Sequence, residues 1–285
     1  MFYGKRKKIM VLLLSLALIL TFVGCAPKAD PAPAAGTTEP AAPEQTPGKI
    51  DKIKSAGKIV LGTAADYPPY EFHKLINGKD EIVGFDIEIA KAIAADLGVE
   101  LVIKDMKFDG LLAALVVDDI DFIIAGMVPT DERKKTVDFS DNYYQAEQKL
   151  LIRTADADMF KTAADFKGKK VGAQKATVQE DIANNEIEGA EVKALSKLTD
   201  LVLELKNKKV DAIVMVGPVA ESYAKQNPDL MIPEIAFGQN ETCAIAVNKG
   251  NEDLVEAINQ TIERLLGDGS IDRFIEEATA LAEEE

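Results

Sequence analysis

Arg133 is the residue whose type and position best suit it to bind a charged ligand. It follows the apolar, strand-like run 120–124 and stands in the first turn of a helix expected to start at Thr130. The positive end of a helix dipole disfavours a cation there, so the arginine calls for an anionic partner. Asp131 and Glu132 offer one internally, whereas a ligand carboxylate would match the guanidinium with two parallel hydrogen bonds. This segment alone leaves both interpretations open.

The loop before Arg133 adds neutral hydrogen-bond donors at the same place. Gly126, Met127 and Val128 follow the end of the expected strand, and their backbone amides could surround the same anion. Loop and arginine together form the candidate anion site of this chain.

Alternating strand and helix patterns must position this loop. The first set comprises expected strands at 58–62, 101–103 and 122–124 and expected helices at 85–97 and 108–117. The second set comprises expected strands at 170–172, 192–195, 211–215 and 243–247 and expected helices at 201–206, 219–226, 251–266 and 270–282. The order of the first set predicts a parallel sheet with helices on both faces, and the alternation along the whole chain is typical of an α/β fold.

Two α/β units of similar content predict two lobes with a cleft between them. Ligands of open α/β sheets bind beyond the carboxyl ends of strands, and the loops after Ile124 and Val171 lie at such ends. The chain should pass between the lobes near residues 145–150 and 240–244, which we expect to act as a hinge. Asp86 is expected to cap the helix at 85–97, and Phe85 to be a core residue.

The N-terminus is expected to be a targeting segment. The basic run 5–8 precedes the apolar run 9–23, and Gly24 precedes Cys25. This pattern is typical of a secretory signal, and the apolar run is short for an uncleaved membrane anchor. The junction resembles the lipobox of bacterial lipoproteins, although Phe22 replaces the usual leucine. The resemblance implies a signal peptide at 1–24 and a lipid, including palmitate, on Cys25.

Residues 25–48 are expected to form a tether behind this anchor. They are rich in Ala, Pro, Thr and Glu and contain almost no large apolar side chain, so they cannot bury enough surface to fold. The remaining residues, about 235, suffice for two lobes. The net charge of −15 falls to about −19 without the four basic residues of the signal. This charge argues against nucleic acid and anionic lipid surfaces as partners.

The chain offers little for metal or thiol chemistry. Cys243 is the only cysteine after Cys25, so no disulfide can form within the expected folded part, and His73 is the only histidine. We therefore expect no metal site and no cofactor.

An ordered set of motifs resembles the solute-binding proteins of polar amino acid ABC transporters, which are bacterial extracellular solute-binding proteins of family 3. The matching segments are 62–72, 84–88, 108–112, 125–133, 139–144, 211–214 and 218–223. The likeness spans about residues 50–282. It implies the two-lobed type II periplasmic-binding-protein fold, with lobe 1 at 49–146 and 240–285 and lobe 2 at 147–239.

The resemblance also implies the ligand contacts. Arg133 would grip the α-carboxylate together with the backbone of the preceding loop, and Tyr67 and Phe108 would enclose the ligand side chain. Thr177 and the amide of Val178 would close over the carboxylate from lobe 2. The complete expected set is Asp66, Tyr67, Phe108, Ala125, Gly126, Val128, Arg133, Lys175, Thr177, Val178 and Val216.

Three positions depart from the family pattern. Val216 stands where an acidic residue usually pairs with the ligand's α-ammonium, and a buried ammonium without a counter-ion is costly. Either Asp66 or Glu241 substitutes for it, or the ligand lacks a free α-ammonium, or binding is weak. Val128 replaces a common Thr or Ser, and Ala176 replaces a usual Gly, which should only restrict its loop.

The resemblance predicts a function without catalysis. A monomeric protein outside the cytoplasm, held to the membrane only by its lipid, would bind a polar amino acid and deliver it to permease subunits of an ABC transporter. The alternatives are a cyclohexadienyl dehydratase-like enzyme, with Glu71 or Asp66 as the acid, and a sensor-type binding protein. A cationic ligand is expected if Asp66 faces its side chain, and a neutral or acidic one if Lys175 does. The apolar Ala64, Ala65 and Val216 leave room for an uncharged ligand such as glutamine.

Overall fold

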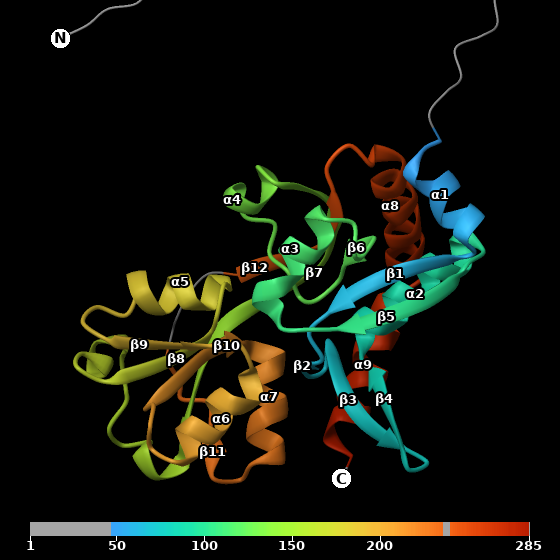
Figure 1. Ribbon diagram of the computed structural model, residues 1–285. Helices are drawn as coiled ribbons and strands as arrows, with labels where there is room; N and C mark the ends of the chain where they lie inside the picture. The colour runs from blue at the N-terminus through green and yellow to red at the C-terminus, as the bar shows by residue number, and fades with distance from the viewer. Residues whose placement is uncertain (1–46, 236–239, 285) are drawn as a thin grey trace, which may run out of the picture. The chain divides into compact units, whose positions relative to one another are not determined.

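The computed structural model describes residues 47–235 and 240–284 (Figure 1). All of them belong to one compact unit, Thr46–Glu285. The expected signal peptide, Cys25 and the expected tether up to residue 46 lie outside the described residues. Within the described ranges, no helix combines the length and the apolar character that crossing a membrane requires.

The elements alternate along the chain as the sequence pattern indicates. The helices are α1 (Lys49–Ala56), α2 (Phe85–Leu97), α3 (Phe108–Val116), α4 (Asp131–Lys134), α5 (Val178–Asn185), α6 (Leu198–Lys206), α7 (Gly217–Gln226), α8 (Glu252–Gly267) and α9 (Ser270–Glu283), with 3₁₀ turns η1 (Thr154–Asp156) and η2 (Ala163–Phe166). The strands are β1 (Lys58–Thr63), β2 (Asp66–Tyr67), β3 (Glu71–Ile76), β4 (Lys79–Val83), β5 (Glu100–Asp105), β6 (Phe122–Ile123), β7 (Val137–Arg153), β8 (Lys170–Gln174), β9 (Glu191–Leu195), β10 (Ala212–Val216), β11 (Leu230–Met231) and β12 (Asn240–Asn248).

Every strand and helix range expected from the sequence is present, with ends shifted by a few residues. The pattern missed α1, the hairpin of β3 and β4, α5, and most of the length of β7. It also missed the short strands β2 and β11. The missed elements are short, strongly exposed or only partly apolar, so their periodicity is weak.

The first part of the sheet supports the loop that carries Arg133. Its strand order is β5-β1-β6-β12, with β1 parallel to β5 and β6 and with β12 antiparallel to β6. Ile59 and Leu61 share a core with α2 and α8, whereas Val60 packs on the other face with the core of α3. Helices on both faces are thus confirmed, as is the parallel pairing expected for the three strands of the first set, and β12 joins these strands in the opposite direction.

The second part of the sheet repeats this arrangement. β10, β8 and β9 are parallel neighbours, and β7 joins β10 in the antiparallel sense. Ile213 and Met215 share a core with α6 and α7. Val171 and Val214 pack on the opposite face with residues of α5 and η2.

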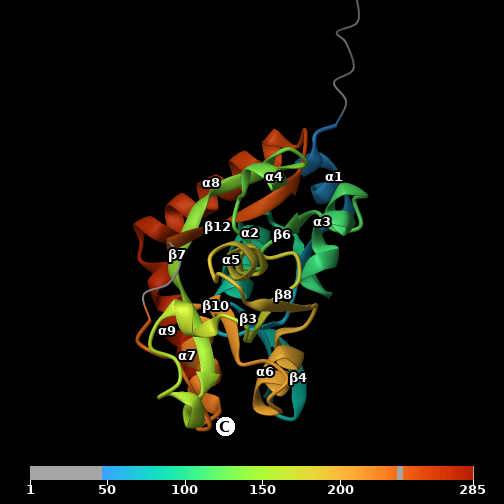
Figure 2. The same ribbon diagram turned by 90° about the vertical axis from the view of Figure 1, so that its left-hand side faces the viewer.

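β7 connects the two parts of the sheet (Figures 1 and 2). Its residues up to Glu147 pair with β12, and those from Gln148 pair with β10. β12 runs antiparallel beside it and shifts register between Cys243 and Ala246, which interrupts the ladder locally. The expected hinge, 145–150 and 240–244, lies at this change of partner. The lobe boundaries given above stay a prediction, which this exchange supports, and lobe 1 and lobe 2 keep those residue ranges below.

Candidate functional site

A small pocket lies at the carboxyl ends of β1, β6 and β8, where the sequence analysis expected a ligand. Its lining residues are Ala64, Tyr67, Glu71, Phe108, Ala125, Gly126, Val128, Arg133, Gln174, Thr177, Val178 and Gln179. The expected set is therefore brought together here, except for Asp66, Lys175 and Val216, which do not line the pocket. Their roles as ligand contacts stay predictions.

Arg133 is buried in this pocket and held by backbone carbonyl groups. Its Nη1 donates to the oxygen of Val128 at 2.7 Å, and its Nη2 donates to that of Ala176 at 2.8 Å. The Phe108 ring lies beneath the guanidinium, 5.4 Å from centroid to Cζ. Thr130 caps the short helix α4 by accepting from the Arg133 amide at 3.3 Å. These contacts fix the direction in which the guanidinium points.

The internal partners offered by the sequence do not neutralise this arginine. Glu132 pairs with Lys135 instead, and within the described ranges no carboxylate forms an ion pair with Arg133. Burial lowers the pKa of Arg133 to about 10, and the charge of Asp181 opposes this effect. The interpretation of Arg133 as an internally paired residue is therefore wrong. Two hydrogen bonds use only part of the five N–H donors of a guanidinium, so donors remain for a ligand carboxylate.

The N-terminus of α5 faces the arginine from lobe 2. Thr177 is its N-cap and accepts from the Glu180 amide at 3.3 Å, while its own hydroxyl donates to Gln174 at 2.6 Å. Val178 and Gln179 begin this helix and line the pocket, and the backbone amides at the start of a helix suit an anion. The spacing of Thr177 and Glu180 is a helix-start signal that could have revealed α5.

The loop before α5 carries two further residues of interest. Ala176 has a φ of 63°, which lies in the left-handed region. This conformation costs a residue with a Cβ about 1 kcal/mol. Alanine in place of the usual glycine therefore strains the backbone of this loop as well as restricting its conformation. Lys175 pairs with Asp109 of lobe 1 at 3.3 Å rather than lining the pocket.

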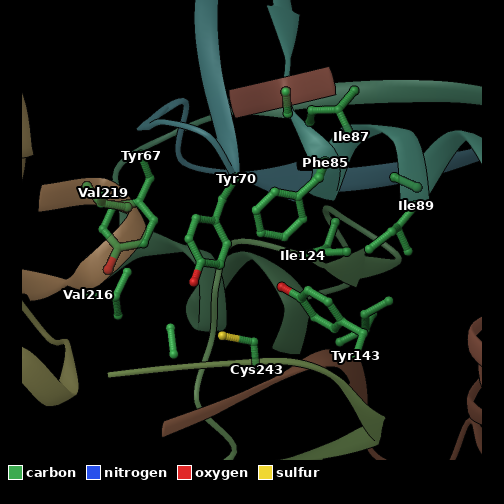
Figure 3. Packing of buried hydrophobic residues seen from close by; sticks show 14 of the residues in the cluster. Tyr67, Tyr70, Phe85, Ile87, Ile89, Ile124, Tyr143, Val216, Val219 and Cys243 are labelled. Atoms are coloured by element: carbon green, nitrogen blue, oxygen red, sulfur yellow. The ribbon is translucent and has the colours of Figure 1, made fainter. Parts of the chain in front are cut away.

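Tyr67 and Val216 belong to an aromatic cluster beside the pocket (Figure 3). The Tyr67 and Tyr70 rings lie 5.3 Å apart, and Tyr70 lies 4.4 Å from Phe85, whose expected core position is confirmed. Figure 3 shows the Tyr67 hydroxyl pointing toward Val216. Tyr67 thus combines core packing with a place in the pocket wall.

Asp66 joins the two lobes. Its Oδ2 accepts from the Leu198 amide at 2.7 Å, and its Oδ1 accepts from Nε2 of Gln174 at 3.2 Å. The Tyr223 hydroxyl donates to the Asp66 carbonyl oxygen at 2.9 Å. Burial raises the pKa of Asp66 to about 6, and the hydrogen bonds from the Leu198 amide and from the Gln174 side chain oppose this shift. Asp66 and Glu241 stay predictions as substitute ammonium partners.

Replacing Asp66 by alanine is expected to favour separation of the lobes. The variant loses both carboxylate bonds across the contact, so we expect ligand affinity to fall about tenfold, or about 1.4 kcal/mol. Calorimetric titration and the radius of gyration from X-ray scattering measure the two effects. Asp141→Ala, at an exposed carboxylate of lobe 1, is the control and should change neither. Equal behaviour of the two variants would contradict the role given to Asp66.

Glu71 and Asp86 form a buried pair of carboxyl groups next to the pocket. The two residues are 1% and 0% exposed. The expected capping of α2 by Asp86 is wrong, because the N-cap is Gly84, which has no side chain. Instead, Oδ2 of Asp86 accepts from the Gly126 amide and from the Tyr143 hydroxyl, both at 2.9 Å. Glu71 was considered above only as a possible catalytic acid, yet it lines the pocket, and none of the residues that the structure describes donates a hydrogen bond to its Oε2.

The pocket is too small in this structure for an amino acid. Its volume of about 10 Å³ corresponds to a single water molecule. The bonds from Arg133 to Ala176 and from Leu198 to Asp66 hold its two sides together. Admission of a larger molecule therefore requires the lobes to move apart.

In the described part of the chain, no group of three His, Cys, Asp or Glu residues is arranged to hold a metal ion.

Comparisons with known proteins agree with this geometry. The family model of bacterial extracellular solute-binding proteins, family 3, matches residues 59–278. The arginine-binding extracellular protein ArtP of Bacillus subtilis (strain 168) is 37% identical over 223 residues, 76% of this chain and 84% of ArtP. The L-cystine-binding protein TcyJ of Escherichia coli (strain K12) is 34% identical over 231 residues, 80% of this chain and 85% of TcyJ.

A solved structure has the same fold. The crystal structure of the amino acid ABC transporter substrate-binding protein AbpA from Streptococcus pneumoniae Canada MDR_19A, bound to L-arginine, has a TM-score of 0.80 and 40% sequence identity. The match covers 82% of this chain and 100% of that one. The two-lobed α/β fold expected from the sequence is thereby confirmed. All three relatives are named as binding proteins, which favours a binding function over the enzyme alternative.

Proposed function

The chain belongs to family 3 of the bacterial extracellular solute-binding proteins and binds an amino acid for an ABC transporter, and we propose that this ligand is a cationic amino acid of the arginine class. The observation that carries the proposal is Glu71. It is a buried acid that lines the same small pocket as Arg133, and no donor among the described residues bonds to one of its oxygens. A ligand with a carboxylate at one end and a cation at the other would satisfy both residues.

Arg133 receives the ligand carboxylate. Its remaining donors and the amides that begin α5 supply hydrogen bonds from opposite lobes. Because Phe108 supports the guanidinium from below, this ring both positions Arg133 and borders the ligand.

Glu71 receives the cationic side chain, with Tyr67 beside it in the pocket wall. Apolar and aromatic surface around an ion pair excludes water and strengthens the attraction between the charges. The arginine named in two of the relatives supports this class of ligand.

Hinge motion admits the ligand and then encloses it. Contacts that a bound molecule makes with both lobes stabilise the closed form and shift the equilibrium toward it. The exchange of strand partners along β7 and the shifted register of β12 provide a flexible crossing. The closed protein then delivers its ligand to the permease subunits.

The N-terminal part of the proposal rests on the sequence. Residues 1–24 direct export, and Cys25 carries the lipid, including palmitate, that anchors the protein outside the cytoplasm. Residues 25–48 tether the folded part to the membrane, and the protein works as a monomer beside its permease.

Titration with arginine and citrulline tests the proposed ligand class. Citrulline matches arginine closely in size but has a neutral side chain. We expect arginine to bind to protein refolded free of ligand with micromolar or lower Kd, and citrulline at least about a hundredfold more weakly, as loss of a buried ion pair implies. Lysine, glutamine and cystine complete the panel. Tighter binding of citrulline, glutamine or cystine than of arginine would contradict a cationic ligand.

A further inference from the structure

We propose that Asp86 shares one proton with Glu71 and thereby makes the pocket selective for a cationic ligand, whose positive charge replaces the proton. This inference rests on the proposed function, since it concerns the same pocket. It assigns a positioning role to Asp86, which does not line the pocket and acts through Glu71.

The two carboxyl groups meet from different elements. Glu71 begins β3 and Asp86 lies in the first turn of α2, and the two buried side chains lie close enough for each to shift the pKa of the other. Among the described residues, none donates a hydrogen bond to Oε2 of Glu71 or to Oδ1 of Asp86. Two buried carboxylates this close cannot both be ionised, because burial and mutual repulsion both disfavour the second charge. A carboxylic acid beside a carboxylate removes the conflict, because the acid donates the hydrogen bond.

The hydrogen bonds place the proton on Glu71. Asp86 accepts from the Gly126 amide and the Tyr143 hydroxyl, and two donors stabilise a negative charge on its carboxylate. Oε2 of Glu71 has no donor of this kind. Burial first, and then the charge of Asp86, raises the pKa of Glu71 well above its usual range, and burial raises that of Asp86 to about 7.

Within the described ranges, no positively charged side chain contributes to the pKa shifts of the pair. The titratable and charged groups that face it are Asp66 of β2, Asp105 of β5, Tyr67 and Tyr70 near β2, Tyr143 of β7, Cys243 of β12 and Arg133 across the pocket. The acids increase the tendency of Glu71 to stay protonated, and the phenols and the thiol are neutral at pH 7. In the described part of the chain, Arg133 is the one cation that lines the pocket, and its donors serve the carboxylate end of the ligand.

A cation that approaches Glu71 changes this balance. It stabilises the ionised carboxylate, so the proton leaves Glu71 for the solvent and the ligand's charge takes its place. The total charge of the buried group is the same before and after. A neutral side chain offers no such exchange and leaves the proton on Glu71. Asp86 also holds the Gly126 amide, so it connects the acidic end of the pocket with the loop that leads to Arg133.

Proton release upon ligand binding tests the inference directly. Arginine is titrated into the wild type at pH 7 in two buffers of different ionisation enthalpy, with citrulline as the neutral probe. We expect about one more proton to be released per arginine than per citrulline. Because binding expels a proton, arginine affinity should rise with pH, by up to about tenfold per unit, while the pair holds its proton.

Two variants separate Asp86 from other sources of protons. Asp86→Asn keeps an acceptor for Gly126 and Tyr143 and places an amide donor toward Glu71. Glu71 should then be ionised before the ligand binds. The number of protons released per arginine should therefore fall to a small fraction of the wild-type value. Glu71→Gln should release none and carries the test if the first variant does not fold. The inference is overturned if the wild type binds arginine tightly without releasing a proton, or if either variant releases as many protons as the wild type. Both outcomes leave the proposed function intact. Failure of the wild type to bind arginine overturns both.

Discussion

Replacing Arg133 by alanine should reduce the affinity for the amino acid by at least about a hundredfold, or about 3 kcal/mol. The variant loses the charged fork that receives the ligand carboxylate and the bond from Nη2 to Ala176 that joins the lobes. It also leaves a buried space above the Phe108 ring. Calorimetric titration with arginine measures the change, and thermal unfolding shows whether the variant is folded.

Arg133→Lys distinguishes charge from geometry. Lysine retains the positive charge but cannot form two parallel bonds to a carboxylate while bonding the Val128 and Ala176 carbonyl groups, so most of the loss should remain. Arg264→Lys is the matched control, since this exposed arginine pairs with Asp96 on the surface of lobe 1. Wild-type affinity in Arg133→Ala would refute the carboxylate site.

The second large effect is expected at Glu71. Glu71→Gln keeps the shape of the protonated side chain but cannot become an anion, so arginine binding should weaken by about a hundredfold while citrulline binding changes little. Selectivity for the cation should therefore be lost, although the fold and the carboxylate site are retained. Titration of both ligands into the variant and the wild type measures the change in this ratio.

Glu100→Gln provides the control for this substitution. It removes the same charge at an exposed position of β5, so it tests whether the general negative charge of the protein attracts arginine. We expect an affinity close to that of the wild type. An equal loss of arginine binding in both variants would show that Glu71 acts through long-range charge rather than through contact.

Much of the fold could be predicted from local patterns in the sequence. Ile89, Ile93 and Leu97 repeat at helical spacing, and Gly98 ends α2 in the left-handed conformation, as expected. β7 was not recognised as one strand because its residues 137–147 include polar and exposed side chains, and its partner changes along its length. Periodicity reports the burial of one face, not the identity of the strand that lies alongside.

Part of the candidate site could be predicted from the sequence. Arg133 was singled out by residue type and by its place after a strand, and the structure brings it together with Tyr67, Phe108 and Thr177. The role of Lys175 as a ligand contact stays a prediction, since its flexible side chain pairs with Asp109 in this structure. The cap assigned to Asp86 was wrong because a carboxylate at a helix start can also point away from its own helix, toward Gly126 and Tyr143.

The amino-acid sequence was sufficient for the alternation of strands and helices, for the order of the motifs and for the anion-binding segment at Arg133. These features depend on neighbouring residues, whose spacing expresses backbone geometry directly. The contact of Asp66 with Leu198 and the proximity of Glu71 to Asp86 required the folded chain. They join distant segments, and the charge of a buried acid depends on which donors and charges packing places around it, not on its neighbours in sequence.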